Sequence, residues 1–379
     1  MLLFQLVGAA ALAVWIYLLF ARGGFWRTRP SPAPASNAPA RSIAVVMPAR
    51  NEEAVVGQAI ASLLNQNYPG PLHIFLVDDH STDGTVTAAG AHDTGAHARL
   101  TVVEAGPLPH GWTGKLWAVS EGLNRARELD VDYILLTDAD IVHSPANVAG
   151  LVARAEALGL DLVSYMVKLR CRTLAERALI PAFVFFFFKL YPPAWVARTD
   201  RKTAGAAGGC MLIRPSALTR IGGMQAIRGE LIDDCALAAR VKQSGKIWMG
   251  LTEDARSIRD YTTFGEILRM ISRSAYTQLH HSVFLLASTI LGMAVIYLSP
   301  PLLLLTRDRM AATCGAAAWV LMTISYVPTL RFYRRSYAWA LCLPLIALFY
   351  MIATLDSAVR YWTGRGGLWK GRVQDVGPF

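Results

Sequence analysis

The chain has 379 residues, of which 54% are hydrophobic and 17% are charged, and its formal net charge is +10. Because a soluble domain carries about 25% charged residues, part of this apolar excess is expected to face lipid. The positive charge forms no basic stripe interleaved with aromatic residues. This argues against nucleic-acid binding and favours arginines beside a membrane or a site for phosphate-bearing ligands.

The first predicted element is a membrane helix at Leu2–Phe20, where Gln5 is the only strongly polar residue. At a rise of about 1.5 Å per residue this run spans about 28 Å, close to one hydrocarbon core. A cleaved signal peptide is the alternative, but the run is long for one and no positive side chain precedes it. Positive residues follow it and place that side in the cytoplasm, namely Arg22, Arg27 and Arg29.

After a linker rich in Pro and Ala, short β-rich runs alternate with helical patterns from Ser42 to about Asp260. This alternation predicts an α/β fold, with a mixed but mainly parallel sheet and helices on both faces. The predicted strands are Ile43–Met47, His73–Val77, Leu100–Glu104 and Tyr133–Thr137, and the clearest predicted helices are Glu52–Asn65, Lys115–Glu128 and Cys235–Lys242.

Acidic and other polar residues directly follow three of these strands, at Arg50–Glu52, Asp78–Ser81 and Asp138–Asp140. Ligands of such sheets bind outside the carboxyl ends of the strands. Carboxylates gathered at that edge would repel one another without a cation or hydrogen-bond donors, so their shared position predicts a binding site. Neither GxxxxGK[ST] nor GxGxxG occurs, so a nucleotide would be held without a P-loop or the usual dinucleotide fingerprint.

The C-terminal third returns to membrane character, with predicted helices at Val283–Leu305, Ala311–Leu330 and Tyr337–Ala353. Buried core helices are the alternative, although little polar surface would remain to cover them. Three crossings would leave the C-terminus outside, whereas its basic residues favour the cytoplasm, so one run could be a hairpin broken at Pro300-Pro301 or Pro344. These basic residues are Arg360, Arg365, Lys370 and Arg372.

A further apolar segment, Ala182–Val196, is unusually aromatic for a soluble domain. One expectation is that it lies in the membrane interface and guides a lipid acceptor, with cations nearby that would meet anionic headgroups. The other is that it forms a buried core helix. The cations are Arg198, Arg201 and Lys202.

Six segments, in this order and spacing, resemble the family 2 glycosyltransferases, whose catalytic domain has the GT-A fold. They are MPARNEE (47–53), VDDHSTDGT (77–85), GKLWAVSEGL (114–123), TDAD (137–140), GGCMLIRPSALTRIGG (208–223) and LIDDCALAARVKQSG (231–245). The N-terminal helix, together with GWTGK (111–115), YTQL (276–279) and WKGR (369–372), is similar to the hopanoid-biosynthesis-associated branch, which has carotenoid and ceramide glycosyltransferases as relatives.

The resemblance implies how a nucleotide-sugar donor is held. Glu52 matches the acidic residue that contacts the nucleoside. Asp79, with Asp78 beside it, matches the aspartate near the base. Lys115 matches a lysine that contacts the phosphates or the nucleotide, although its local sequence also fits a solvated helix start.

The family's DxD motif is matched by Asp138 and Asp140. Asp140 would bind Mg²⁺ or Mn²⁺, which prefers carboxylate and water ligands, and Asp138 would face the ribose or the metal. The pair Asp233-Asp234 matches the family's Glu-Asp, and Asp234 would be the general base. Burial and the neighbouring carboxylate should raise its pKa above the usual value of about 3.9. Local sequence alone also fits a helix cap at this pair.

Three departures from the family pattern bear on function. Processive members carry Gln-x-x-Arg-Trp, whereas this chain has Arg269–Tyr276 there, in which Arg273 could bind the diphosphate instead. The mismatch favours a single transfer over polymer synthesis. His80 stands where glycine is common, and Asp233 is shorter than the usual glutamate.

The sequence therefore predicts an inverting glycosyltransferase, anchored in the inner membrane by several helices, with its catalytic domain in the cytoplasm. It would move a sugar from a nucleotide-diphosphate sugar, expected to be a UDP-sugar, to a lipid acceptor related to hopanoids. A processive polysaccharide synthase and an inactive membrane scaffold are the alternatives. The predicted regions are an anchor (1–21), a linker (22–41), a catalytic domain (42–260), an interfacial segment (261–281), membrane helices (282–356) and a basic tail (357–379).

Overall fold

The computed structural model describes residues 1–31, 39–91, 98–369 and 372–373. They form two compact units that do not follow chain order. The helical unit comprises Met1–Arg29, Cys171–Trp195 and Tyr261–Gly367, and the sheet unit comprises Pro30–Arg170, Val196–Asp260 and Leu368–Phe379. Residues 32–38 of the predicted linker, and residues 370–371 and 374–379 of the basic tail, lie outside the described residues; they include Lys370. The predicted region boundaries stay a prediction.

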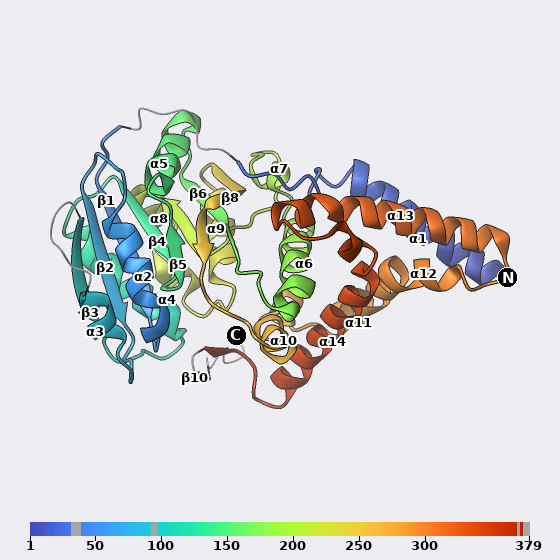
Figure 1. The fold of residues 1–379 in the computed structure, drawn as a ribbon. Helices are drawn as coiled ribbons and strands as arrows, with labels where there is room; N and C mark the ends of the chain where they lie inside the picture. Colours follow the sequence, from blue (N-terminus) through green and yellow to red (C-terminus); the bar gives the residue numbers. More distant parts are fainter. Residues whose placement is uncertain (32–38, 92–97, 370–371, 374–379) are drawn as a thin grey trace. The chain divides into compact units, whose positions relative to one another are not determined.

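The sheet unit is built on eight strands (Figure 1). They are β1 (Ile43–Ala49), β2 (Leu72–Asp78), β3 (Ala98–Glu104), β4 (Tyr133–Thr137), β5 (Ile141–His143), β6 (Leu162–Lys168), β7 (Cys210–Ile213) and β8 (Ile247–Ser257). Their order is β3-β2-β1-β4-β7-β6-β8-β5. The four strands predicted from the sequence pair in parallel, whereas β7 is antiparallel to both β4 and β6. The remaining pairs are β6–β8, which is parallel, and β5–β8, which is antiparallel.

Helices cover both faces of this sheet, as the alternating pattern predicts (Figure 1). Val45 and Met47 of β1 belong to a buried cluster with α2 (Glu53–Leu64) and α5 (Asn147–Leu158). Val46 points to the other face, toward α4 (Gly114–Arg127). There an added Cβ on Gly122 would lie 2.5 Å from Val46, so this close crossing requires glycine. Shorter helices are α3 (Thr85–Gly90), α8 (Pro215–Arg220) and α9 (Asp233–Lys242).

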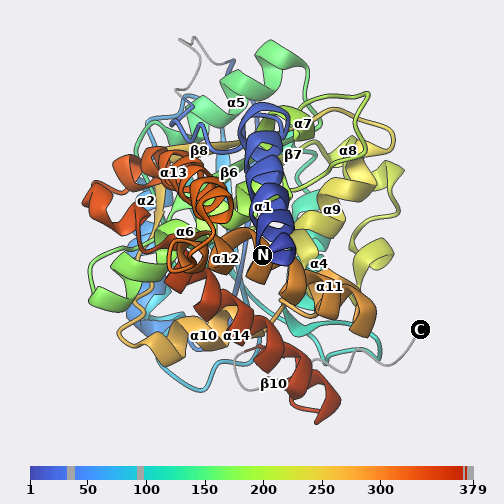
Figure 2. The same ribbon diagram turned by 90° about the vertical axis from the view of Figure 1, so that its right-hand side faces the viewer.

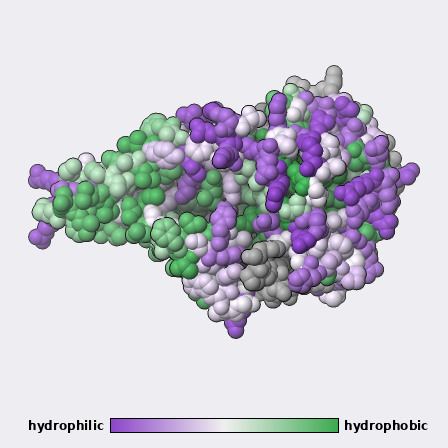
Figure 3. Space-filling view, turned by 180° about the vertical axis from the view of Figure 1, so that it is seen from behind, coloured by the Kyte–Doolittle hydropathy of each residue, from purple (hydrophilic) through white to green (hydrophobic). Residues whose placement is uncertain are grey.

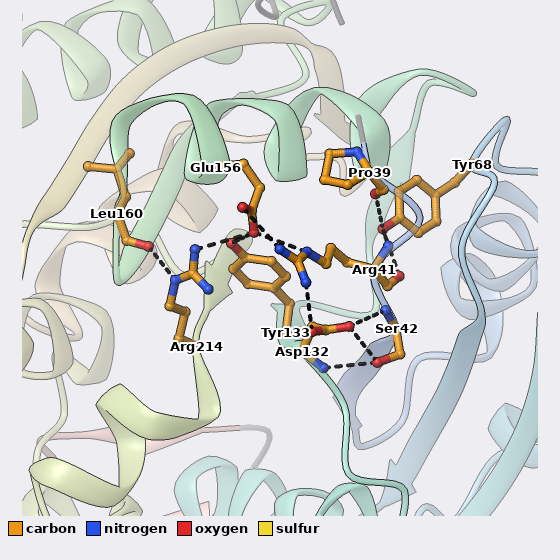
Figure 4. A network of polar contacts seen from close by, with 9 residues as sticks. All are labelled: Pro39, Arg41, Ser42, Tyr68, Asp132, Tyr133, Glu156, Leu160 and Arg214. Carbon is orange, nitrogen blue, oxygen red and sulfur yellow. Dashed lines mark hydrogen bonds and ion pairs between the residues drawn. The ribbon is translucent and has the colours of Figure 1, made fainter. Parts of the chain in front are cut away.

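A polar network holds the sheet at the N-terminal ends of β1 and β4 (Figure 4). Glu156 of α5 accepts a hydrogen bond from the Tyr133 hydroxyl at 2.7 Å and forms ion pairs with Arg41 at 3.4 Å and Arg214 at 3.3 Å. Burial would raise the pKa of Glu156, but Tyr133 and the two guanidinium groups hold it below its ordinary value. The network ties α5 and β4 to the end of β7 and to the chain entering β1.

Asp132, just before β4, continues this network. Its carboxylate accepts hydrogen bonds from the backbone N–H of Ser42 at 2.8 Å and from the Ser42 hydroxyl at 2.9 Å, and pairs with Arg41 at 3.5 Å. The Tyr68 hydroxyl donates to the Arg41 carbonyl at 2.7 Å. The start of β1 is therefore fixed by charge as well as by strand pairing.

The helical unit contains α1 (Leu2–Phe20), α6 (Leu174–Leu190), α10 (Phe264–Ser272), α11 (Val283–Met293), α12 (Ser299–Leu303), α13 (Arg309–Phe332) and α14 (Leu343–Trp362). Figures 1 and 2 show α1 alongside α13. The one strongly polar residue of α1, Gln5, donates to Asp308 at 2.8 Å. Asp308 caps α13 by accepting from the backbone N–H groups of Met310 and Ala311. An amide in the apolar helix thus has a defined partner.

Five stretches of the described residues are long and apolar enough to cross a membrane. They are Leu2–Phe20, Leu174–Val196, Val283–Leu303, Arg309–Phe332 and Leu343–Trp362. Large hydrophobic side chains on this unit face outward, as at Phe20, Phe284 and Leu305. Figure 3 shows hydrophobic residues gathered over the part of the helical unit that carries α1, α12 and α13. These features suggest membrane association, because soluble proteins rarely expose large contiguous apolar patches.

The structure corrects one predicted helix. Instead of a helix over Tyr337–Ala353, a short 3₁₀ turn at Tyr337–Ala340 precedes α14, which begins at Leu343. Pro344 lies in the first turn of α14, where its missing N–H needs no partner, so it begins a helix rather than breaking a hairpin. The aromatic segment Ala182–Val196 comprises the second half of α6 and the following turn α7 (Pro193–Val196). Most of α6 is buried, as expected for a core helix, yet the stretch Leu174–Val196 is also long enough for a crossing.

Candidate active site

Loops after β1, β2 and β4 bring acidic residues to the carboxyl edge of the sheet. Ala49 and Asp78, the last residues of β1 and β2, are paired in register, so the residues that follow them share this edge. Glu52 and Asp140 are joined there by Arg259, whose Nη2 lies 2.6 Å from Glu52 Oε1 and whose Nε lies 3.6 Å from Asp140 Oδ2. The structure therefore brings together two residues that are 88 positions apart (140 − 52) in the sequence.

Two side chains that hold Asp140, at the end of β8 and just after it, are not among the residues predicted from the sequence. Ser257, the last residue of this strand, donates a hydrogen bond from its hydroxyl to Asp140 Oδ2. Arg259 follows two residues later. The β-rich start of the strand, Ile247–Leu251, was a usable signal, because a strand there would have placed Ser257 and Arg259 beside the other strand ends.

The two aspartates expected near the base are held by the turn after β2. Asp78 Oδ2 accepts a hydrogen bond from the Ser81 N–H at 3.1 Å, and Asp79, only 1% exposed, pairs with Arg50 at 3.5 Å. His80 has a left-handed φ of 52°, a conformation that glycine adopts most easily. The turn thus keeps the backbone form expected of glycine although a histidine occupies the position.

Lys115 lies between two carboxylates from different elements. Its Nζ is 3.0 Å from Asp138 Oδ1 and 3.3 Å from Asp233 Oδ2. Thr113 caps α4 by accepting from the Leu116 N–H, which fixes Lys115 in the first turn. Burial would lower the pKa of Lys115, but the two carboxylates raise it above its ordinary value. The lysine is charged and partly buried, so a solvated helix start does not describe it.

Asp234 lies in the first turn of α9, beside Asp233. Its Oδ2 accepts from the Gly208 N–H at 2.8 Å and its Oδ1 from the Cys235 N–H at 2.7 Å. Burial, and next the negative charge of Asp233, raise the pKa of Asp234 to about 6, against the opposing effect of Lys115. The rise is the one expected of a general base. The N-cap residue, Ile232, makes no side-chain capping bond, and the two aspartates lie in the first turn, where their charge suits the helix dipole. Because Asp234 also accepts from the Cys235 N–H, a role at the helix start coexists with the site.

A pocket opens beside Lys115, Asp138, Gly208 and Asp233. An added Cβ on Gly208 would lie 3.4 Å from Asp234 Oδ2 and 3.5 Å from Lys115 Nζ, so the backbone passes close to both charged groups. The pocket's apolar lining is Pro48, Leu116, Val119, Leu136, Met211, Met224, Ile227 and Leu237.

Asp138 and Asp140 offer carboxylate oxygens to a hard divalent cation. Among the described residues no group of three or more His, Cys, Asp or Glu side chains is arranged to hold a metal ion. Mg²⁺ sites commonly use one or two carboxylates together with substrate phosphates. The two aspartates therefore fit an ion that is held jointly with a bound diphosphate.

Arg273, predicted to contact the diphosphate, belongs to the helical unit, where it follows α10. Its predicted contact stays a prediction.

Known proteins resemble this chain in sequence and in fold. Residues 44–222 match the family model described as Glycosyl transferase family 2. A beta-monoglucosyldiacylglycerol synthase from Synechocystis sp. is 34% identical over 107 residues, which cover 28% of this chain and 21% of that protein. The chain thus matches about a fifth of the length of this relative.

Among solved structures, the mannosyltransferase PcManGT from Pyrobaculum calidifontis, in complex with GDP-Man and Mn²⁺, has a TM-score of 0.55 at 18% identity, covering 95% of this chain and 99% of its own. This likeness shows a shared fold. Glucosyl-3-phosphoglycerate synthase from Mycobacterium tuberculosis, in complex with Mn²⁺, UDP-Glc and glycerol 3-phosphate, has a TM-score of 0.41 at 22% identity, covering 66% and 85% of the two chains. A score at that level supports no inference.

Proposed function

Because this chain is a family 2 glycosyltransferase, we propose that it transfers one sugar from a nucleotide-diphosphate sugar to a lipid acceptor, with inversion at the anomeric carbon. The observation that carries this proposal is the arrangement of Lys115 and two aspartates that line the pocket, with a third aspartate, Asp234, held by the pocket residue Gly208. Lys115 lies between Asp138 and Asp233, and the pKa of Asp234 is raised to about 6. A carboxylate of raised pKa is suited to accept a proton, and a nearby cation is suited to a phosphate.

In the proposed reaction the acceptor hydroxyl oxygen attacks the anomeric carbon on the face opposite the diphosphate. As the new C–O bond forms, the C–O bond to the diphosphate breaks and its electron pair leaves with the diphosphate. The hydroxyl proton moves to the Asp234 carboxylate, which the N–H groups of Gly208 and Cys235 hold in place. Lys115 stabilises the negative charge on the departing diphosphate.

The donor is proposed to be a UDP-sugar, with Glu52, Asp78 and Asp79 on its nucleoside side. Asp140, with Asp138, is proposed to hold Mg²⁺ or Mn²⁺, which when bound neutralises charge on the diphosphate. Arg273 is proposed as a further diphosphate contact.

The lipid acceptor is supported by the apolar helices and by the likeness to the Synechocystis beta-monoglucosyldiacylglycerol synthase, whose name describes a glycolipid synthase. A hopanoid-type lipid, suggested by the sequence resemblance, and a diacylglycerol are the two acceptors to test first. We propose that the protein lies in the inner membrane with its sheet unit on the cytoplasmic side. By the positive-inside rule this orientation is supported by the arginines that follow α1, namely Arg22, Arg27 and Arg29.

The test uses the full chain in lipid nanodiscs. Thermal unfolding is measured with UDP-glucose, UDP-N-acetylglucosamine and GDP-mannose, each with and without Mn²⁺, because a ligand stabilises the state that binds it. The stabilising donor, radiolabelled, is then supplied with hopanoid polyol or diacylglycerol. We expect label in a lipid carrying a single sugar. Label in a polymer would show a processive synthase, and an absence of donor binding and of transfer would show a scaffold.

A further inference from the structure

His143 is a buried polar residue that the proposed reaction does not use. It ends β5, three residues after Asp140, and it is 3% exposed. Its Nδ1 lies 2.8 Å from the Asn147 side-chain nitrogen, and its Nε2 lies 3.0 Å from the Thr137 hydroxyl oxygen. Thr137 is the last residue of β4 and directly precedes Asp138. Both ring nitrogens of His143 thus have partners inside the sheet unit.

The direction of each hydrogen bond follows from the last acceptor. The Thr137 hydroxyl lies 2.8 Å from the Gly209 carbonyl, which can only accept, so the single hydroxyl proton of Thr137 is donated there. His143 Nε2 must then carry the proton that it donates to Thr137. Nδ1 is left without a proton and accepts from the Asn147 amide. Burial lowers the pKa of His143 to about 4, which keeps the ring neutral, as this arrangement requires.

This relay ends at the peptide segment that holds Asp234. Gly209 accepts from Thr137, and the preceding residue, Gly208, donates its N–H to Asp234 Oδ2 at 2.8 Å. The same segment is fixed one residue earlier, where the Ala207 N–H donates to the Ser164 hydroxyl at 2.8 Å. A shift of the Gly208 N–H would therefore move or release the Asp234 carboxylate.

We propose that His143 and Thr137 are positioning residues for Asp234, acting through the Gly208–Gly209 backbone. The proposal rests on the proposed function, because it assigns these residues to the same proton-accepting group. Two apolar side chains in place of His143 and Thr137 would fill the same space without burying hydrogen-bonding groups. A purely structural role therefore does not explain why these hydrogen bonds all run toward the Gly209 carbonyl. These hydrogen bonds link Thr137, which precedes Asp138, to the loop whose Gly208 N–H donates to Asp234.

Thr137 offers a matched pair of variants. Thr137→Val keeps the branched shape and strand preference but removes the hydroxyl, whereas Thr137→Ser keeps the hydroxyl. We expect T137V to lower kcat by about 10- to 100-fold, because small misplacement of a reacting group has effects of this order. KM for the donor and Kd for UDP with Mn²⁺, measured by calorimetry, should stay within about twofold, because the relay acts in the transition state. T137S should retain at least about half of the activity.

A second pair tests the same relay from the histidine. His143→Gln can still present an N–H to Thr137, whereas His143→Leu cannot, so H143Q should be several-fold more active than H143L at equal folded fraction. This pair decides the question if T137V fails to fold. An inactive wild-type chain would contradict the proposed function. If the wild type is active, either of two results would overturn the relay: a kcat of T137V equal to that of the wild type, or an equal loss of activity in T137V and T137S.

Discussion

The two ends of the sheet hold acidic residues in opposite ways. At the N-terminal ends of β1 and β4, Glu156 is surrounded by two arginines and a tyrosine hydroxyl, and its pKa lies below the ordinary value. At the carboxyl ends, Asp234 lies beside another carboxylate and one lysine, and its pKa rises to about 6. Both groups lose hydration on folding. The number of cations and donors around each one decides the sign of its shift.

The arrangement around Glu156 stabilises the fold, whereas the raised pKa of Asp234 suits proton transfer. Charge at the Glu156 end is balanced and its hydrogen bonds join four segments of chain. Charge at the Asp234 end is left in excess, since Lys115 faces Asp138 and Asp233 together. An incompletely compensated site of this kind has a cost in stability and is typical of active sites.

The largest effect is expected from Asp234→Asn. Loss of the proposed general base should lower kcat by about 10²- to 10⁴-fold. Asn removes a charge that burial and Asp233 disfavour, but it leaves one of the two backbone N–H donors without an acceptor, so the melting temperature at pH 8 should stay close to that of the wild type. Activity is measured with the labelled donor, and unfolding by circular dichroism. Full activity in D234N would contradict the assignment of the base.

Lys115→Gln comes next, with an expected fall of about 100-fold in kcat/KM, because a charge beside the phosphates is removed. Lys115 also lowers the pKa of Asp234, so the acid limb of the pH–rate profile should move to higher pH in the variant. Lys246→Gln, a change at an exposed lysine on the same unit, is the control. A profile that does not move would show that Lys115 and Asp234 are not coupled.

The wild-type pH profile gives a smaller but direct test. Asp234, the proposed base, accepts a proton only when ionised, so kcat/KM, which reports the pKa values of the free enzyme, should fall about tenfold for each pH unit below a midpoint near 6. For stability the two ends have opposite signs. The raised pKa of Asp234 gives a contribution that is present below about 4 and is lost as pH rises through about 6. The lowered pKa of Glu156 gives a contribution that is present above its usual 4.5 and is lost as pH falls.

Glu156→Gln should have the smallest effect on activity and a clear effect on stability. The variant keeps the shape but removes the Glu156 charge from Arg214 and from Arg41, and Arg41 keeps its ion pair with Asp132. Because these groups are partly exposed, we expect a loss of only about 1–2 kcal/mol in unfolding free energy. Transfer at low temperature should stay within about twofold of the wild type. A loss of transfer as large as that in D234N would remove the contrast between the two ends.

The sequence predicts the strands of the parallel half and the acidic residues after them, because buried strands and the turns that follow have strong local patterns. The ion pairs of Lys115 with Asp138 and Asp233 agree with a role of Lys115 in the site. No local sequence pattern predicts the distances between these three side chains. Arg259 and Ser257 were missed because their position depends on β8 pairing with β5 and β6, far apart in sequence. The predicted start of α14 at Tyr337 is wrong because the residues from Tyr337 to Ala353 are apolar throughout. Hydropathy therefore does not reveal the turn that separates Tyr337–Ala340 from the helix.

The antiparallel strand β7 connects the Asp234 end of the sheet to the Glu156 end. It has only four residues, with Gly208-Gly209 just before it and Arg214 just after it. A slip of one residue in its pairing with β4 would turn its side chains to the other face and, at the same time, shift the Gly208 N–H away from Asp234 and Arg214 away from Glu156. A register error in β7 would therefore disturb the contacts of Asp234, the proposed base, and of Glu156 at the same time.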